Sequence, residues 1–319
     1  MTIVALHYTN DNFFAMSDGL ISRGAARVVE KTKKLVPFKP EYKIPRISLG
    51  RLNGFTKYIG GDFYVGFAGN YTLISTVITE FSNIVSRQLV LQRDEKSGSP
   101  LVYNRSDEGE GLRNRQYWDD YNFSDNELPS ITVNFLSNIL HKVIESASSD
   151  FAKNSMMAPD IELIIFGTEK VDHRQNNRAQ VLKCNKFIDS KPIVERHSVL
   201  PWSIACIGDS TVIPAVVADI ESDPIYQLYP SDLTKTSKGS YNWLSQSSTL
   251  HKLEQKRVNV MMRKILPIIL MNTGSIGGDC MIARSSWATK LHTSNIRNED
   301  IDALIDTLDN QTQQQETKA

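Results

Sequence analysis

The chain has 319 residues, of which 40% are hydrophobic and 23% charged, and its formal net charge at pH 7 is zero. These values are ordinary for a globular protein with a large core, and the charge balance gives no overall field that attracts nucleic acid or an acidic membrane. Three scattered cysteines argue against a disulfide framework or a zinc site, and no apolar run is long enough to span a bilayer. We therefore expect a cytoplasmic protein with no cofactor or metal and with no nucleic-acid or membrane partner.

The first 34 residues carry the most informative pattern. Residues 2–8 favour a strand, 9–12 form a turn cluster, and 13–16 are again apolar, so the sequence predicts a β-hairpin. That hairpin brings Asp18, at the end of the second strand, beside Thr2 at the start of the first. Lys34 follows sixteen residues after Asp18, at the head of another short apolar run.

A hydroxyl, a carboxylate and an amine at this spacing can act together once Met1 is removed. Thr2 then carries both its hydroxyl and a free α-amine, whose ordinary pKa of about 8 lets it serve as its own general base. A Lys34 ammonium held beside Asp18 eases ionisation of the hydroxyl and lowers the pKa of the α-amine. Each residue alone is more often part of a turn, a solvated basic run or an ordinary N-terminus, but the combination favours an active site.

The next segments alternate between insertions and regular elements. Residues 39–58 predict a long hairpin or extended loop, and residues 63–67 predict a buried strand. Asn70 can cap a helix whose apolar residues, from Leu73 to Val85, recur at helical spacing. The polar segment 93–123 is predicted to be a surface insertion, and its acidic residues lack the alternating ligands of an EF-hand loop.

A capping box opens the following helix. Ser124 and Glu127 have the required spacing, and Pro129 is expected in the first turn of a helix that reaches Val143. The later predicted elements are strands at 161–166, 179–183 and 202–207, a helix at 212–220, an insertion at 222–248, a helix at 249–270, a strand at 277–283 and a helix at 298–308. Pro267 is expected to end or kink its helix.

The order of these elements predicts an α+β fold. Two strand-rich blocks separated by paired helices, with more helices near the end, favour two stacked sheets covered by helices on both outer faces. We expect one domain over residues 1–308, with insertions at about 39–58, 93–123 and 222–248. A polar tail over 309–319 follows it.

Several blocks resemble a known family. Thr2-Ile-Val, Asp18-Gly and Lys33-Lys-Leu35 resemble the start of proteasome β-subunits, and more closely the bacterial proteasome-like (HslV-type) threonine peptidase that works with an AAA+ unfoldase. Phe63–Gly69 resembles the family strand that ends in Gly-x-Ala-Gly, and Ile204–Gly208 resembles the strand before an Ala-Ile-Gly-Ser-Gly turn. These blocks extend over roughly 2–88 and 159–220, with a weaker match at 274–285.

The resemblance implies a fold, partners and supporting residues. The fold is the four-layer αββα sandwich of the N-terminal nucleophile hydrolases. The substrates are proteins or peptides, the assembly is a homo-oligomer that can be a ring, and an AAA+ unfoldase is a candidate partner. The backbone of Gly69 is the implied donor to an oxyanion, with Gly66 as the alternative register.

The chain also departs from the family pattern. Where the family has Gly-Ser-Gly, this chain has Gly208-Asp209-Ser210, so the assisting group is either the Ser210 hydroxyl or the Asp209 carboxylate. Before Gly277-Gly278 the family has an aspartate, whereas this chain has Thr273 and Ile276, with Ser275 adjacent.

We therefore expect a threonine-type peptidase or amidase that forms an acyl-enzyme on Thr2. The alternative is a catalytically inactive scaffold or assembly subunit of the same fold, which the departures favour, and a small-molecule amidase is a third hypothesis. Other catalytic motifs, such as GxSxG, HExxH and the phosphate-binding loop, are absent from the sequence. His7, in an apolar strand, is predicted to be a buried core histidine.

Overall fold

The structure, a computed structural model, describes most of the chain. The described residues are 2–23, 26–29, 31–48, 51–94, 96–104, 123–154, 159–171, 174–188, 191–228, 243–271, 276–285 and 292–316. Among them, no helix combines the length and apolarity needed to cross a membrane.

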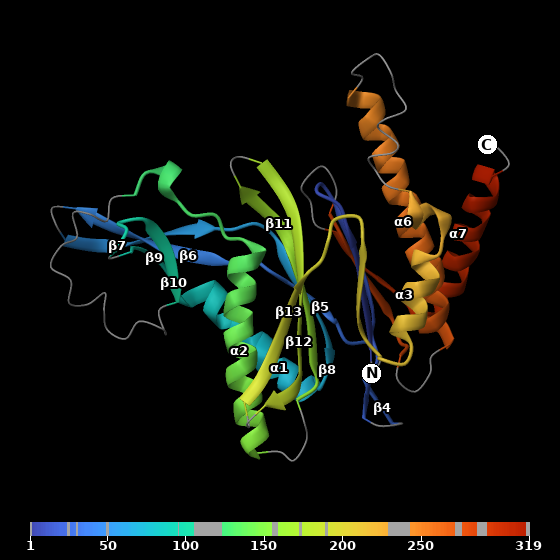
Figure 1. The fold of residues 1–319 in the computed structure, drawn as a ribbon, viewed down its shortest axis with the longest axis horizontal. Helices are drawn as coiled ribbons and strands as arrows, with labels where there is room; N and C mark the ends of the chain where they lie inside the picture. The colour runs from blue at the N-terminus through green and yellow to red at the C-terminus, as the bar shows by residue number, and fades with distance from the viewer. Residues whose placement is uncertain are drawn as a thin grey trace.

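Two five-stranded antiparallel sheets form the centre of the molecule (Figure 1). The first sheet has the order β14-β1-β2-β15-β16, with β1 (Ile3–Tyr8), β2 (Phe13–Asp18), β14 (Ile204–Gly208), β15 (Cys280–Arg284) and β16 (His292–Ile296). The second has the order β13-β12-β11-β8-β5, with β5 (Leu35–Phe38), β8 (Phe63–Gly69), β11 (Ile161–Val171), β12 (Arg174–Ile188) and β13 (Lys191–Ser198).

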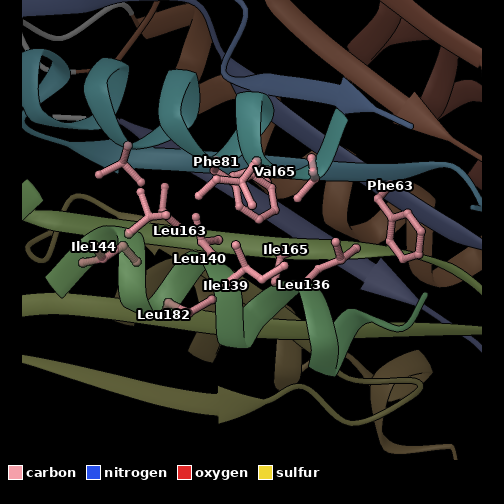
Figure 2. Packing of buried hydrophobic residues seen from close by; sticks show 14 of the residues in the cluster. Phe63, Val65, Phe81, Leu136, Ile139, Leu140, Ile144, Leu163, Ile165 and Leu182 are labelled. Carbon is pink, nitrogen blue, oxygen red and sulfur yellow. The ribbon is translucent and has the colours of Figure 1, made fainter. Parts of the chain in front are cut away.

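Helices cover the outer face of each sheet. On the second sheet lie α1 (Tyr71–Asn83) and α2 (Val133–Asn154), and on the first lie α3 (Ile213–Glu221), α6 (Trp243–Met271) and α7 (Ile301–Glu316) (Figure 1). Figure 2 shows the helix–sheet packing on the second sheet, where Phe81 of α1 and Leu140 of α2 meet Leu163 of β11. The four layers are therefore α, β, β and α, and the predicted α+β sandwich is confirmed.

Burial on both faces explains the composition of the central strands. Every residue of β1 is buried, with Val4 and Leu6 packed between the two sheets and Ile3 and Ala5 packed toward the outer helices. A strand covered on both sides is expected to be apolar throughout instead of alternating with polar residues. The one polar side chain in this strand, His7, is also buried, as predicted.

Local capping groups mark the start of α1 as predicted, but not the start of α2. Asn70 caps α1 as predicted, because its side chain accepts a hydrogen bond from the N–H of Leu73 at 3.2 Å. The capping box of Ser124 and Glu127 also forms, but it closes only the 3-10 turn η3 (Asp125–Glu127). The following α-helix, α2, begins at Val133, so the prediction that placed Pro129 in its first turn is wrong.

Pro267 does not end its helix. It lies inside α6, which runs on to Met271, although a proline in a helix interior costs about 3 kcal/mol. Leu266 and Ile269, on either side of it, are fully buried in the core beside the first sheet. Their burial offsets the loss of a hydrogen bond, since tertiary packing commonly overrides local preference. Helix α7 likewise continues beyond Leu308 to Glu316, through most of the polar tail.

Regular structure also occupies part of the segments interpreted as insertions. The elements found there or beside them are β6 (Glu41–Ser48), β7 (Arg51–Ile59), the π-helical turn η1 (Ile84–Gln88), β9 (Leu89–Arg93), β10 (Pro100–Asn104) and α4 (Pro224–Gln227). The four strands form a separate sheet of order β10-β9-β6-β7, which projects from the sandwich (Figure 1). Residues 105–122 and 229–242 lie outside the described residues. The remaining short elements are β3 (Ile21–Arg23), β4 (Ala26–Val29) and η4 (Asn298–Asp300).

Candidate active site

The first hairpin sets two of the predicted site residues side by side. β1 and β2 are antiparallel with Val4 opposite Ser17, so the start of β1 lies beside the end of β2. The turn between the two strands is closed by a hydrogen bond from the N–H of Thr9 to the carbonyl of Asn12, at 2.8 Å. Thr2 and Asp18 therefore meet at the same end of the first sheet.

Lys34 reaches this pair from the second sheet. It directly precedes β5, and its own carbonyl accepts the N–H of Phe67 in β8 at 3.2 Å. Its ammonium group donates to Thr2 Oγ1, to Asp18 Oδ1 at 2.9 Å and to the carbonyl of Leu20. The exposed fractions of Thr2, Asp18 and Lys34 are 5%, 0% and 2%. The structure thus brings the three predicted side chains into one buried cluster.

Backbone groups hold the Asp18 carboxylate in place. Its Oδ1 also accepts the N–H of Ile3 at 2.9 Å, and its Oδ2 accepts those of Leu20 at 3.4 Å and Gly277 at 3.3 Å. A buried carboxylate is stable only when such donors and an opposite charge compensate its lost hydration. Because these donors come from several segments, the orientation of Asp18, and hence of Lys34, is fixed from several sides.

The environment of Lys34 changes its acidity. Burial lowers the pKa of Lys34 below its usual range, and the Asp18 carboxylate opposes that shift through its charge and its hydrogen bond. Desolvation is the larger effect because the whole side chain is enclosed. An amine with a lowered pKa gives up a proton more readily than an exposed lysine does, which suits a group in contact with a hydroxyl.

A tight turn after β14 contacts the backbone of Thr2. Gly208 pairs with Ile3 at a φ of +127°, and a Cβ added there would lie 1.8 Å from the Thr2 carbonyl oxygen. Only glycine allows the two chains to approach so closely. The next N–H, of Asp209, donates to that same carbonyl at 2.8 Å.

The two supporting groups predicted on this turn have different surroundings. The Asp209 carboxylate is turned into its own loop, where Oδ1 accepts the N–H of Thr211 at 2.9 Å and its hydroxyl at 2.6 Å. Ser210 is exposed on the turn between β14 and α3. Asp209 therefore reaches Thr2 through its backbone N–H.

The two candidate oxyanion glycines occupy different positions on β8. Gly66 lies within the strand, where an added Cβ would approach Val4 Cγ1 to 2.8 Å, so its lack of a side chain lets the two sheets pack. Gly69 is exposed at the end of the strand, two residues beyond Phe67, with a φ of +112°. An added Cβ there would lie 2.1 Å from the carbonyl oxygen of Asp160. Its position at the strand end suits a backbone donor better than that of Gly66.

The sequence did not point to every group in the site. The Leu20 carbonyl and the Gly277 N–H contribute only their backbone atoms, so no side-chain pattern marks them. Glu162 of β11 accepts the N–H of Gly208 at 2.7 Å. The sequence feature that could have marked Glu162 is its position as the single acidic residue in the otherwise apolar run 161–166. Thr273 and Ser275 lie outside the described residues.

His7 belongs to a separate buried cluster. Its Nδ1 lies 3.1 Å from the carbonyl of Ser203, and its ring makes edge contacts with Trp202 and Tyr226. Burial, together with the nearby Arg257 guanidinium, lowers the pKa of His7 to about 4. His7 is therefore neutral at pH 7.

The fold and the site define an α+β sandwich with a buried Thr–Lys–Asp cluster at one end of its first hairpin. Among solved structures, the chain is similar to Anbu from Hyphomicrobium sp. strain MC1, with a TM-score of 0.44, and to its Gly-1 mutant, with a TM-score of 0.48. In both cases the identity is 10%, and the match covers 100% of this chain and 98% of the other. No family model and no curated protein matches the sequence.

Proposed function

We propose that the protein is an N-terminal threonine hydrolase that cleaves peptide or amide bonds through Thr2. The observation that carries the proposal is the contact of the Lys34 ammonium with Thr2 Oγ1 while the buried Asp18 carboxylate holds that ammonium. A hydroxyl becomes a useful nucleophile when a neighbouring charge and a nearby base ease the loss of its proton. The resemblance of the first 34 residues to threonine peptidases supports the same proposal.

The mechanism begins with removal of Met1, which frees the α-amine of Thr2. This amine takes the proton from Oγ1 as the oxygen attacks the carbonyl carbon of the substrate. Lys34 stabilises the negative charge that develops on Oγ1, and its lowered pKa makes the ammonium group a better proton donor to that oxygen. Asp18 orients Lys34 and stabilises its charge.

The attack produces a tetrahedral intermediate with a negatively charged oxygen. We assign stabilisation of that oxygen to the backbone N–H of Gly69, because preorganised backbone donors are the usual solution for such a charge. The C–N bond then breaks, and the leaving amine takes the proton held by the Thr2 α-amine. The product is an ester between the substrate acyl group and Oγ1.

Water completes the cycle. The α-amine accepts a proton from the attacking water, the ester C–O bond breaks, and Oγ1 regains its proton as the carboxylic acid leaves. During both steps the Asp209 N–H holds the Thr2 carbonyl, so the nucleophile keeps its position. Of the two groups predicted to assist proton movement, we assign that role to the Ser210 hydroxyl, because the Asp209 carboxylate is bound to Thr211.

The test is the intact mass of the purified protein before and after treatment with a peptide epoxyketone, which needs both the hydroxyl and the α-amine of an N-terminal threonine. We expect a chain without Met1 and a single adduct. Thr2→Ala abolishes the adduct, whereas Thr2→Ser, which keeps both groups, retains it. A trimmed protein that hydrolyses peptides equally well as wild type and as Thr2→Ala would refute the proposal.

A second candidate function is an inactive scaffold or assembly subunit. The observation that favours it is that Ser210 is exposed, in a turn that departs from the Gly-Ser-Gly pattern. A retained Met1 blocks the α-amine and selects this alternative.

Under either candidate we propose a homo-oligomer, and the active form would take protein or peptide substrates with an AAA+ unfoldase as partner. Sedimentation of the purified protein tests the oligomer.

A further inference from the structure

The start of β11 carries an acidic side chain that the proposed mechanism leaves unused. Glu162 Oε2 accepts the N–H of Gly208 at 2.7 Å, and its Oε1 accepts the Lys183 ammonium at 2.6 Å. Its side chain is only 16% exposed. Glu162 belongs to the second sheet and Gly208 to the first, so this hydrogen bond joins the two sheets beside Thr2.

Gly208 is the point at which this bond acts on the candidate nucleophile. Its backbone lies so close to the Thr2 carbonyl that no side chain fits, and the N–H of Asp209 donates to that carbonyl at 2.8 Å. A carboxylate that fixes the N–H of Gly208 therefore fixes the surface against which the Thr2 backbone rests. Displacement of this turn would displace Thr2 with it.

The same end of β11 also borders the candidate oxyanion donor. Ile161 pairs with Gly69, and Glu162 pairs with Ala68. The carbonyl of Asp160 accepts the N–H of Asn70 at 2.6 Å, just beyond Gly69. The residues around Glu162 thus hold Gly69 on one side, while its carboxylate holds Gly208 on the other.

The charge of Glu162 suits this position. A hydrogen bond to an ionised acceptor is stronger than one between neutral groups, so a carboxylate fixes a backbone N–H more firmly than an amide does. The Lys183 ammonium, which is one-third exposed, compensates the partial burial of the carboxylate. The carboxylate thus bridges the two sheets with a counter-charge beside it.

We propose that Glu162 is a positioning residue for the reaction at Thr2. Its carboxylate, held by Lys183, fixes the Gly208–Asp209 turn and thereby sets the distance between Thr2 Oγ1 and the N–H of Gly69. This inference rests on the proposed function and adds to it the residue that aligns the nucleophile with the oxyanion donor.

The experiment compares Glu162→Ala and Glu162→Gln with a matched control, Glu169→Gln. Glu169 lies on the same strand, is 7% exposed, and accepts a backbone N–H, that of Val133 at 2.6 Å, away from the Thr2 cluster. Turnover of a fluorogenic peptide gives kcat and KM, and hydrogen exchange gives the protection of the Gly208 and Asp209 amides.

We expect Glu162→Ala to lower kcat on the order of 10²-fold with little change in KM, because misplacing a nucleophile affects the reaction more than binding. Glu162→Gln keeps an acceptor for the Gly208 N–H, and we expect a loss of about fivefold. In both variants the Gly208 and Asp209 amides exchange faster than in wild type. Glu169→Gln lowers stability but leaves kcat and the exchange of those two amides as they are in wild type.

The outcomes separate this inference from the proposed function. Equal kcat and equal amide exchange in Glu162→Gln and Glu169→Gln overturn the inference while the proposed function stands, and this comparison holds even where Glu162→Ala does not fold. A wild-type protein that neither turns over peptides nor reacts with the epoxyketone overturns both. In that case, faster exchange at Gly208 in Glu162→Gln identifies Glu162 as a structural clamp only.

Discussion

The ammonium group of Lys34 lies 2.9 Å from the carboxylate of Asp18, and neither side chain is more than 2% exposed. A buried pair of this kind depends on both partners, because either charge alone is left without water and without a counter-charge. An exposed pair behaves differently, since water replaces a missing partner at little cost. This difference yields the first prediction.

Asp18→Asn removes the counter-charge of Lys34 and is expected to lower the free energy of unfolding by about 3–5 kcal/mol. The control is Glu41→Gln, which breaks the exposed Lys57–Glu41 pair of 2.7 Å and is expected to cost about 0–1 kcal/mol. Denaturant unfolding at pH 7 measures both. Similar losses in the two variants would show that the buried pair is not a stabilising unit.

The buried His7 predicts a loss of stability in acid. Burial and the Arg257 guanidinium lower its folded-state pKa to about 4, below the unfolded value of 6.5. A depressed pKa means that the unfolded chain binds the proton first, so the contribution of His7 is complete above pH 6.5. It is lost as the pH falls toward 4, by up to roughly 3 kcal/mol.

Unfolding free energies measured from pH 7.5 to pH 4 test this prediction. His7→Phe is expected to be less sensitive to pH in this range than wild type. The control His251→Gln changes a histidine whose side chain is 63% exposed and is expected to keep the wild-type slope. A slope that is the same in all three proteins excludes His7 as the source.

Two glycines with nearly the same φ allow the cost of backbone strain to be distinguished from the cost of a close contact. Gly208 has a φ of +127° and the Thr2 carbonyl 1.8 Å from an added Cβ, whereas Gly54 has a φ of +131° and open space around it. Gly54→Ala is therefore expected to lower the free energy of unfolding by about 1–3 kcal/mol through backbone strain alone. Gly208→Ala is expected to cost more and also to abolish epoxyketone labelling at Thr2.

Denaturant unfolding and mass spectrometry together check this comparison. The labelling measurement matters because strain alone predicts equal instability in the two variants. A Gly208→Ala protein that folds and labels at the wild-type rate contradicts the close approach of the turn to Thr2.

The packing between α2 and the second sheet gives a fourth prediction. Leu140 is fully buried in this layer, so Leu140→Ala is expected to lower the free energy of unfolding by about 2–5 kcal/mol. Leu200, which is 71% exposed, provides the same substitution at the surface, where changes usually stay within about 0.5 kcal/mol. Thermal or denaturant unfolding distinguishes the two, and equal losses would contradict the observed layer.

Local patterns predicted much of this fold. The hairpin from Thr2 to Asp18, the cap at Asn70 and the helical stripe through Phe81 depend on neighbours a few residues away, and a sequence displays such relations directly. The contact of Lys34 with Thr2 followed from spacing and from the resemblance. The chemical roles of these three residues remain proposals.

Elements that depend on residues far away along the chain could not be predicted from local sequence patterns. β13 lies at the edge of its sheet, has a single buried residue and contains Pro192, so its residues show no apolar alternation. β10 lies inside the segment 93–123, which is predicted to be a surface insertion, and its partner β9 ends at the first residue of that segment. Helix α6 continues past Pro267 because residues from other elements bury its neighbours, which local propensity does not reveal.

Asp18 accepts a hydrogen bond from Gly277, which is 259 positions further along the chain. The cluster around Thr2 also needs Asp209, so it is assembled from both ends of the sequence. During synthesis at about 5–20 residues per second, Thr2 leaves the ribosome many seconds before Gly277, the last residue that binds Asp18. A nascent chain therefore cannot form the complete Thr2 cluster until the segment around Gly277 has been made.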